Sequence, residues 1–332
     1  MALIHIVSPA SARENNGNWQ TASRWRRHLA RDHRVTIGPD WRPGDDVPDL
    51  LIALHARRSA AALAAFATAH PARPALLVLT GTDLYRDIHD DAAAQASLLH
   101  ATGLVVLQPR GLDELPPDMR AKARVIYQSA PRLAPAQPRR GVPLDVVMVG
   151  HLRHEKDPQT FMDAARLVAT PGVRLLHVGA ALDPELGRRA RATQAEAPAY
   201  RWLGALPHLA ARRRLRRCHA MVIASRMEGG ANVIIEAVTS GVPVLASHIS
   251  GNAGMLGDDY AGFFPPGDAR ALADLVERSV RDPAFLARLR RQCAARAALF
   301  TPAAERARLL DLVDNLLSRD TAPEHSYERK HT

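Results

Sequence analysis

Short apolar runs alternate with longer amphipathic stretches along most of the chain. Runs rich in valine and leucine at this length are typical of strands buried on both faces of a sheet. In the first half the runs cover Leu3–Val7, Arg34–Ile37, Leu50–Leu54, Ala75–Leu79, Gly103–Leu107 and Arg124–Tyr127. In the second half they cover Leu144–Val149, Val173–Val178, Tyr200–Leu203, Ala220–Ala224, Val242–Ala246 and Gly262–Phe264. Helical patterns such as Asn18–Ala30 and Ser59–Ala69 lie between runs, so the sequence predicts parallel βαβ units with right-handed crossovers.

A proline-rich stretch, Pro131–Pro143, divides the two series of strands and has the composition of a linker. The sequence therefore predicts an α/β protein with an N-terminal domain over residues 1–130, a linker over 131–143 and a second domain over 144–300. A helix over 301–318 and a flexible polar tail over 319–332 complete the chain. Two doubly wound parallel-sheet (Rossmann-like) domains would face a central cleft, with ligands beyond the carboxyl ends of the strands.

The charge of the chain is strongly basic. Its 332 residues include 44 Lys and Arg against 34 Asp and Glu, which gives a formal net charge of +10. This excess favours anionic partners such as nucleic acid, an acidic membrane or phosphorylated small molecules, although a coding bias toward arginine would produce the same composition. The dense run Arg212–Arg217 is expected on a helix, as a solvated face or as a contact for nucleic acid or anionic lipid. Because aromatic residues make up only 5%, no nucleic-acid partner is expected.

Several classes of protein are excluded by missing features. Cys218 and Cys293 form no disulfide framework, which fits a reducing compartment and predicts a cytoplasmic location. No apolar run reaches the roughly 18 residues of a membrane span, and the start of the chain lacks the features of a signal peptide. The motifs of P-loop NTPases, α/β-hydrolases and Asp-x-Asp metal sites are absent, and His151 and His154 have no further zinc ligand nearby. Neither a metal nor a cofactor is therefore expected.

The strongest motif is the segment Ser225–Ala237, which follows the strand predicted at Ala220–Ala224. Gly229 and Gly230 permit close backbone approach, and a helix beginning near Ala231 would direct its free N–H groups, including that of Asn232, at an anion. Glu236 lies within that helix, where its carboxylate can accept two hydroxyls of a ribose, and Glu228 precedes the glycines, where it can reach a sugar ring. The alternative is a glycine-rich turn with two exposed glutamates.

A second motif, Gly150–Pro158, follows the strand predicted at Leu144–Val149. It contains Lys156, one of only three lysines in the chain, and Arg153. Cations at this position would neutralise a diphosphate leaving group as its charge develops, unless the segment is only a solvated basic loop.

Three loops of the N-terminal half carry candidate acceptor groups. Gly17 and Asn18 open a helix and form either a second anion site or an ordinary capped turn. His55 follows the strand at Leu50–Leu54 and is expected to bind a sugar hydroxyl or an oxyanion, or else to be structural. Thr82 and Asp83 follow the strand at Ala75–Leu79 and either bind the acceptor or cap the next turn.

Around Glu228–Ala237 the sequence resembles the donor site of family 4 glycosyltransferases of the GT-B fold, and the resemblance extends over nearly the whole chain. It implies that the loop at Gly150–Lys156 binds diphosphate, that Glu228 contacts the donor sugar and that Glu236 holds the ribose. His151 stands where the family usually has arginine, and Arg153 is expected to substitute for it. The resemblance also implies that no metal is required, that the anomeric configuration is usually retained and that the last helix returns toward the N-terminal domain.

Four segments carry a narrower resemblance, to the selenosugar synthases of selenoneine biosynthesis; they are Asn15–Trp25, Leu54–Ser59, Leu79–Asp87 and Gly150–Pro158. This resemblance implies a UDP-sugar donor, either UDP-N-acetylglucosamine or UDP-glucose, and selenophosphate as acceptor, with a 1-seleno sugar as product. Selenophosphate is a small polyanion with a nucleophilic selenium, so it needs a cationic pocket more than a general base. Two alternatives remain: a family 4 transferase with an oxygen acceptor, lipid or polysaccharide, and a non-catalytic basic protein that binds nucleic acid.

Overall fold

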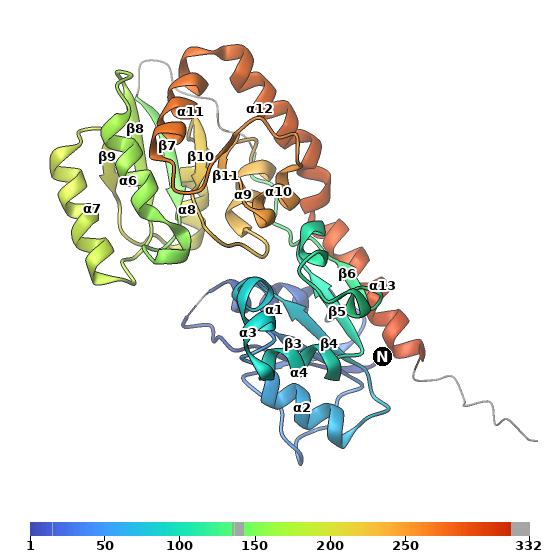
Figure 1. The fold of residues 1–332 in the computed structure, drawn as a ribbon. Helices are drawn as coiled ribbons and strands as arrows, with labels where there is room; N and C mark the ends of the chain where they lie inside the picture. The colour runs from blue at the N-terminus through green and yellow to red at the C-terminus, as the bar shows by residue number, and fades with distance from the viewer. Residues whose placement is uncertain (15, 135, 137–142, 320–332) are drawn as a thin grey trace, which may run out of the picture. The chain divides into compact units, whose positions relative to one another are not determined.

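The computed structural model describes residues 1–14, 16–134, 136 and 143–319. Within these residues the chain forms two six-stranded parallel sheets, each with helices around it (Figure 1). Of the described residues, those within 1–106, 116–126 and 306–319 form one compact unit, and those within 107–115 and 127–305 form the other. Parts of the predicted linker (135 and 137–142) and of the predicted tail (320–332) lie outside the described residues.

The sheet of the first unit has the strand order β2-β1-β3-β4-β5-β6. Its elements are β1 (Leu3–Val7), α1 (Gly17–Leu29), β2 (Arg34–Gly38), β3 (Leu50–Leu54), α2 (Ala60–Ala69), β4 (Ala75–Leu79), the π-helical turn η1 (Asp83–Asp87), α3 (Ile88–Asp90), α4 (Ala92–His100), β5 (Gly103–Val106), α5 (Pro117–Arg120) and β6 (Ala123–Val125). Every residue of β3 and β4 is buried, which explains why both sequences are continuously apolar.

The sheet of the second unit has the strand order β12-β11-β10-β7-β8-β9. Its elements are η2 (Pro109–Leu112), β7 (Leu144–Val149), the 3-10 turn η3 (His154–Lys156), α6 (Pro158–Leu167), β8 (Val173–Val178), α7 (Pro184–Glu196), β9 (Tyr200–Trp202), α8 (His208–Leu215), β10 (Ala220–Ile223), α9 (Asn232–Thr239), β11 (Val244–Ser247), α10 (Ser250–Leu256), β12 (Phe263–Phe264), α11 (Ala269–Arg281), α12 (Pro283–Arg296) and η4 (Ala297–Phe300). Helix α11 packs against α6, and α9 packs against α12.

The last helix, α13 (Pro302–Arg319), belongs to the first unit from Arg306 onward. Arg306 pairs with Asp32 at 2.6 Å, and Leu316 lies beside Gly103 at the start of β5. These contacts attach the helix to the sheet of the first unit.

The α/β prediction of two parallel, doubly wound sheets is confirmed, and all twelve predicted strands begin and end within two residues of the expected positions. The largest shift at the start of a strand is at β11, which was expected from Val242 and begins at Val244. The Val242 N–H instead donates to the Ala237 carbonyl at the end of α9 (2.9 Å), and Pro243 has no N–H that could donate to a neighbouring strand.

Candidate active site

The second sheet reverses its strand order between β7 and β10, which pair directly. From β7 the chain continues outward to β8 and β9, and from β10 it continues in the other direction to β11 and β12. Ligands of doubly wound sheets bind at the carboxyl ends of the strands beside such a reversal, because the loops diverge there. The two strongest sequence motifs are the loops that follow β7 and β10, so the topology brings them together.

An ion pair joins these two loops. The Lys156 Nζ lies 2.5 Å from the Glu228 Oε1, and the Ser225 hydroxyl donates to the same oxygen at 2.5 Å. The side chain of Lys156 is 20% exposed and that of Glu228 is 10% exposed, so the pair is largely withdrawn from water. The alternative of an exposed turn glutamate is therefore wrong for Glu228.

Arg226 provides two further links between the loops. Its backbone N–H donates to the Glu155 carbonyl at 2.9 Å, and its guanidinium lies 3.0 Å from the Asp157 carboxylate. Asp157 has a φ of +44° and caps α6, with its carboxylate accepting from the backbone and hydroxyl of Thr160. This left-handed residue turns the chain sharply after Lys156, which fixes where the lysine lies.

Gly230, which precedes α9, is required by close packing. A β-carbon on Gly230 would lie 2.7 Å from the Leu107 β-carbon, so a larger residue does not fit. Helix α9 begins at Asn232, and the preceding Ala231 has no side chain that could cap its first N–H groups. The start of α9 therefore offers uncapped donors and the positive end of the helix dipole beside Glu228.

His151 and Arg153 lie on the loop after β7 and are both exposed. The Ala180 N–H donates to the His151 Nδ1 at 3.0 Å, so in the neutral ring the Nε2 carries the hydrogen. Partial burial, with Arg153 and Lys156 nearby, lowers the pKa of His151. The hydrogen on the His151 Nε2 is thus left as a donor on the exposed side chain, and its contact with a diphosphate stays a prediction.

The first sheet reverses its order between β1 and β3, and His55 directly follows β3. His55 is 4% exposed and has a φ of +74°, a strained conformation for a histidine. Its Nε2 lies 3.2 Å from the Thr82 hydroxyl and 3.9 Å from the Asp87 carboxylate, which also binds Arg57 at 2.9 Å. Burial lowers the pKa of His55, and the nearby carboxylates partly oppose this effect.

Asp83 is fully buried. Its carboxylate accepts from the backbone N–H groups of Ala56, Thr80 and Gly81 at 2.8–3.2 Å, so it holds the loops after β3 and β4 together. Asp83 therefore does not cap the turn that follows it, because η1 has no side-chain cap and the hydrogen bonds of the Asp83 carboxylate go to residues before it in the chain. A direct contact between an acceptor and either Asp83 or Thr82 stays a prediction.

Gly17 and Asn18 open α1 as predicted. The Asn16 side chain accepts from the N–H groups of Asn18 (3.0 Å) and Trp19 (3.3 Å), so part of the expected anion site is already capped. A β-carbon on Gly17 would meet nothing within 4 Å, which leaves space beside it. The role of Gly17 and Asn18 in acceptor binding stays a prediction.

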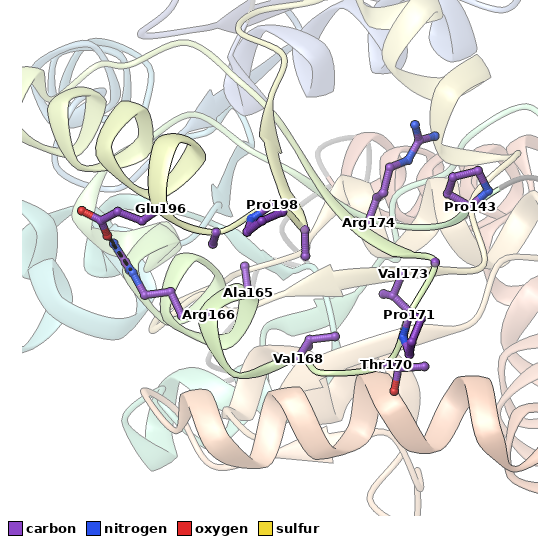
Figure 2. Close-up of a pocket in the computed structure, with 13 residues that line it drawn as sticks. Pro143, Ala165, Arg166, Val168, Thr170, Pro171, Val173, Arg174, Glu196 and Pro198 are labelled. Atoms are coloured by element: carbon purple, nitrogen blue, oxygen red, sulfur yellow. Dashed lines mark hydrogen bonds and ion pairs between the residues drawn. The ribbon is translucent and has the colours of Figure 1, made fainter.

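A cavity of about 570 Å³ opens at the amino ends of β7, β8 and β9 (Figure 2). Its lining includes Pro143, Val173 and Pro198, and its charged groups are paired, for example Arg166 with Glu196 at 2.9 Å. The cavity lies at the opposite strand ends from Lys156 and Glu228 and holds none of the predicted site residues. We therefore assign it no part in the chemistry.

Three other properties of the described part of the chain concern metal ligands, reactive cysteines and membrane-spanning helices. No cluster of three or more His, Cys, Asp or Glu there could hold a metal ion. Both cysteines are buried, and burial raises the pKa of each thiol, that of Cys218 to about 12. Of the helices described, none is long and apolar enough to cross a bilayer.

The family model for glycosyl transferases group 1 matches residues 132–299, which is about half of the chain and includes both loops of this site. The chain belongs to this family. Its activity is therefore that of a glycosyltransferase, and the match does not support the alternative of a non-catalytic nucleic-acid-binding protein.

Solved structures agree on the fold of this glycosyltransferase. Sucrose-phosphate synthase from Thermosynechococcus elongatus has a TM-score of 0.76 at 17% identity, covering 96% of this chain and 100% of that one. HepE from Anabaena in complex with UDP-glucose has a TM-score of 0.76 at 15% identity, covering 95% and 100%. The lipopolysaccharide outer core galactosyltransferase WaaB has a TM-score of 0.67 at 14% identity, covering 95% and 99%. The fold is GT-B, as predicted.

Sequence reasoning missed two residues of this glycosyltransferase that surround Glu236. The His208 Nε2 lies 2.6 Å from the Glu236 Oε1, and the Arg212 Nε lies 3.8 Å from the same oxygen. Arg212 is 6% exposed and donates to the Pro131 carbonyl at 2.5 Å, so the prediction of a solvated arginine face is wrong at this position. Arg213, Arg214 and Arg217 of the same run are exposed.

Proposed function

We propose that this glycosyltransferase takes its sugar from a UDP-sugar bound between the loops after β7 and β10. The observation that carries the proposal is the pairing of Lys156 with Glu228 at 2.5 Å beside the uncapped start of α9. In the proposal the diphosphate lies against the N–H groups of Gly229–Asn232, and Lys156, Arg153 and His151 contact its oxygens. The likeness in fold to HepE, which was solved with UDP and with UDP-glucose, supports this choice of nucleotide.

The two glutamates take separate roles in this proposal. Glu236, one of whose oxygens is held by His208, presents its other oxygen to the ribose hydroxyls. Glu228 orients the donor sugar while its partner Lys156 contacts the leaving diphosphate. When the bond between the anomeric carbon and the diphosphate oxygen breaks, UDP departs with the electron pair, and the Lys156 and Arg153 cations stabilise that developing charge.

For the acceptor, we propose selenophosphate, on the basis of the family resemblance and of the charges around His55. Arg57 and Arg58 lie two and three residues after His55, and Arg86 lies on the neighbouring loop, where it contacts Asp87 at 3.1 Å. Exposed guanidinium groups favour a small anion over a neutral hydroxyl acceptor. The selenium attacks the anomeric carbon as UDP leaves, and hydrolysis of the phosphorus–selenium bond then gives the 1-seleno sugar and phosphate. His55 and Thr82 would orient the anion.

Mass spectrometry of the products tests donor and acceptor together. The enzyme is mixed with UDP-N-acetylglucosamine or UDP-glucose and with selenophosphate, and a parallel reaction contains a polysaccharide or lipid hydroxyl acceptor. The proposal expects UDP and a selenium-containing sugar in the first reaction only. Release of UDP with a glycosylated hydroxyl acceptor, and none with selenophosphate, would replace the acceptor while leaving the donor site intact. A thermal melt that UDP does not shift would contradict the donor site itself.

A further inference from the structure

A buried histidine on the neighbouring strand β8 holds the Gly150–His151 peptide, with which the loop after β7 begins. The Nε2 of His177, on β8, lies 3.3 Å from the Gly150 carbonyl oxygen, and its Nδ1 lies 2.9 Å from the Tyr200 hydroxyl. A carbonyl can only accept, so the Nε2 carries the hydrogen, and in the neutral ring the Tyr200 O–H donates to the Nδ1. The hydrogen bonds therefore run in one direction, from Tyr200 through His177 to Gly150.

Burial keeps this arrangement in one protonation state. His177 and Tyr200 are both fully buried, with the Phe161 ring 5.9 Å from the imidazole. Burial lowers the pKa of His177 to about 4 and raises that of Tyr200. At neutral pH the ring is thus uncharged, with its single hydrogen committed to Gly150.

The surrounding backbone fixes the same peptide. The Gly150 N–H donates to the Val178 carbonyl and the Leu152 N–H to the Ala180 carbonyl, both at 2.8 Å. A β-carbon on Gly179 would lie 1.9 Å from the Gly150 oxygen, so only glycine permits that approach. The Gly150 carbonyl consequently has one orientation, toward His177 and Gly179.

This orientation determines where the next N–H group points. In a trans peptide the C=O of Gly150 and the N–H of His151 point in opposite directions, and no cis peptide bond occurs in the described chain. The His151 N–H has no acceptor among the described residues. The aliphatic part of Lys156 runs alongside Gly150, 3.7 Å from the position a β-carbon would take. The unused N–H therefore belongs to the loop that carries the Lys156 ammonium.

We propose that the Tyr200–His177 pair positions the Gly150–His151 peptide so that the His151 backbone N–H donates to the diphosphate of the nucleotide. The inference rests on the proposed donor site and adds to it a main-chain donor and two positioning residues, neither of which touches the ligand. A backbone N–H held in this way needs no reorganisation when the phosphate charge develops.

The test compares the affinities for UDP and for uridine, measured by calorimetry, in wild type and in His177→Phe. Phenylalanine keeps a ring in the buried site but removes the hydrogen bond to Gly150. We expect the Kd for UDP to rise about tenfold, the value of one hydrogen bond to a charged group, while the Kd for uridine changes less than about twofold. His177→Gln keeps an N–H donor and should recover most of the affinity for UDP, and Tyr200→Phe should show a smaller loss.

His219→Phe is the matched control, because the His219 Nε2 also bonds a main-chain carbonyl, that of Ser279 at 2.9 Å, but next to the amino end of β10. It should leave the ratio of the two affinities unchanged. An unaltered UDP affinity in His177→Phe, or a proportional loss for UDP and uridine, would overturn the positioning role. Failure of the wild-type enzyme to bind UDP would instead overturn the donor site, so the two failures are distinguishable.

Discussion

Removing the ammonium group of Lys156 should destabilise the protein, because it leaves the Glu228 charge buried with Ser225 as its remaining partner. Lys156→Met keeps an unbranched apolar stem in place of the lysine. Removing one member of a buried pair costs about 3–5 kcal/mol, whereas an exposed pair contributes under about 1 kcal/mol. The side chains here are 20% and 10% exposed, which is between those limits, so we expect the free energy of unfolding to fall by about 2 kcal/mol.

The double variant Lys156→Met/Glu228→Gln separates stability from catalysis. It contains no unpaired buried charge, so its stability should return to within about 1 kcal/mol of wild type. If the proposed donor site is right, its turnover should not return, because the leaving diphosphate still lacks the ammonium group. We expect kcat to stay at least about 100-fold below wild type in both variants.

Urea denaturation and steady-state turnover at saturating donor measure these two quantities. Arg189→Met is the control, because Arg189 pairs with Glu185 on the exposed face of α7 at 3.0 Å and should change stability by less than about 0.5 kcal/mol. A Lys156→Met variant as stable as this control would show that the pair contributes nothing. Recovery of turnover in the double variant would show that Lys156 contributes to stability and not to catalysis.

Three further results are expected. Glu236→Ala should weaken UDP binding about tenfold or more, whereas Lys156→Ala should lower kcat more than it raises KM, and an equal loss of UDP affinity in both would contradict their separate roles. Folding lowers the pKa of His177 from 6.5 to about 4, because the ring is buried. Between these pH values His177 therefore binds a proton only in the unfolded chain. The free energy of unfolding should therefore drop as pH falls from 6.5 toward 4, by at most about 1.4 kcal/mol per unit from this group, and His177→Gln should flatten that slope in denaturation curves. Gly17→Leu should raise the KM for the acceptor and leave UDP affinity unchanged, and an unchanged acceptor KM would remove Gly17 from the acceptor site.

The fold could be predicted because its signal is local. Continuous apolar runs such as Leu50–Leu54 and Ala75–Leu79 form strands that are buried on both faces of the sheet. When helices connect such strands, the sheet is parallel and only a few strand orders are compatible with right-handed crossovers. The loops after β7 and β10 were also found, since glycines, cations and carboxylates directly after a strand are visible in the sequence. The Asn16 cap had a local signal as well, an asparagine before the first helical residue, which favours a capped turn.

The partners of Glu236 could not be predicted in this way. His208 is 28 residues away, at the start of α8, and it reaches the carboxylate on α9 across the intervening strand β10. Arg212 belongs to a run of arginines that looks uniformly solvated, and only the structure shows which member turns inward. The positive φ of His55 likewise had no local signal, and the next N–H, that of Ala56, is held by the Asp83 carboxylate at 3.0 Å from another loop.

The contacts of Lys156 within the protein bear on how the proposed donor site would work. The Glu228 carboxylate holds the Lys156 Nζ and the stem lies beside Gly150, so contacts within the protein determine the position of the ammonium. An arriving diphosphate would then add a second anionic partner to a cation whose position is already determined, and little side-chain entropy would be lost on binding. The link from Arg226 to Asp157 and Glu155 holds the same loop from its other side. The loop geometry therefore favours a site that is built in advance, with electrostatic stabilisation available as soon as the bond to UDP begins to break.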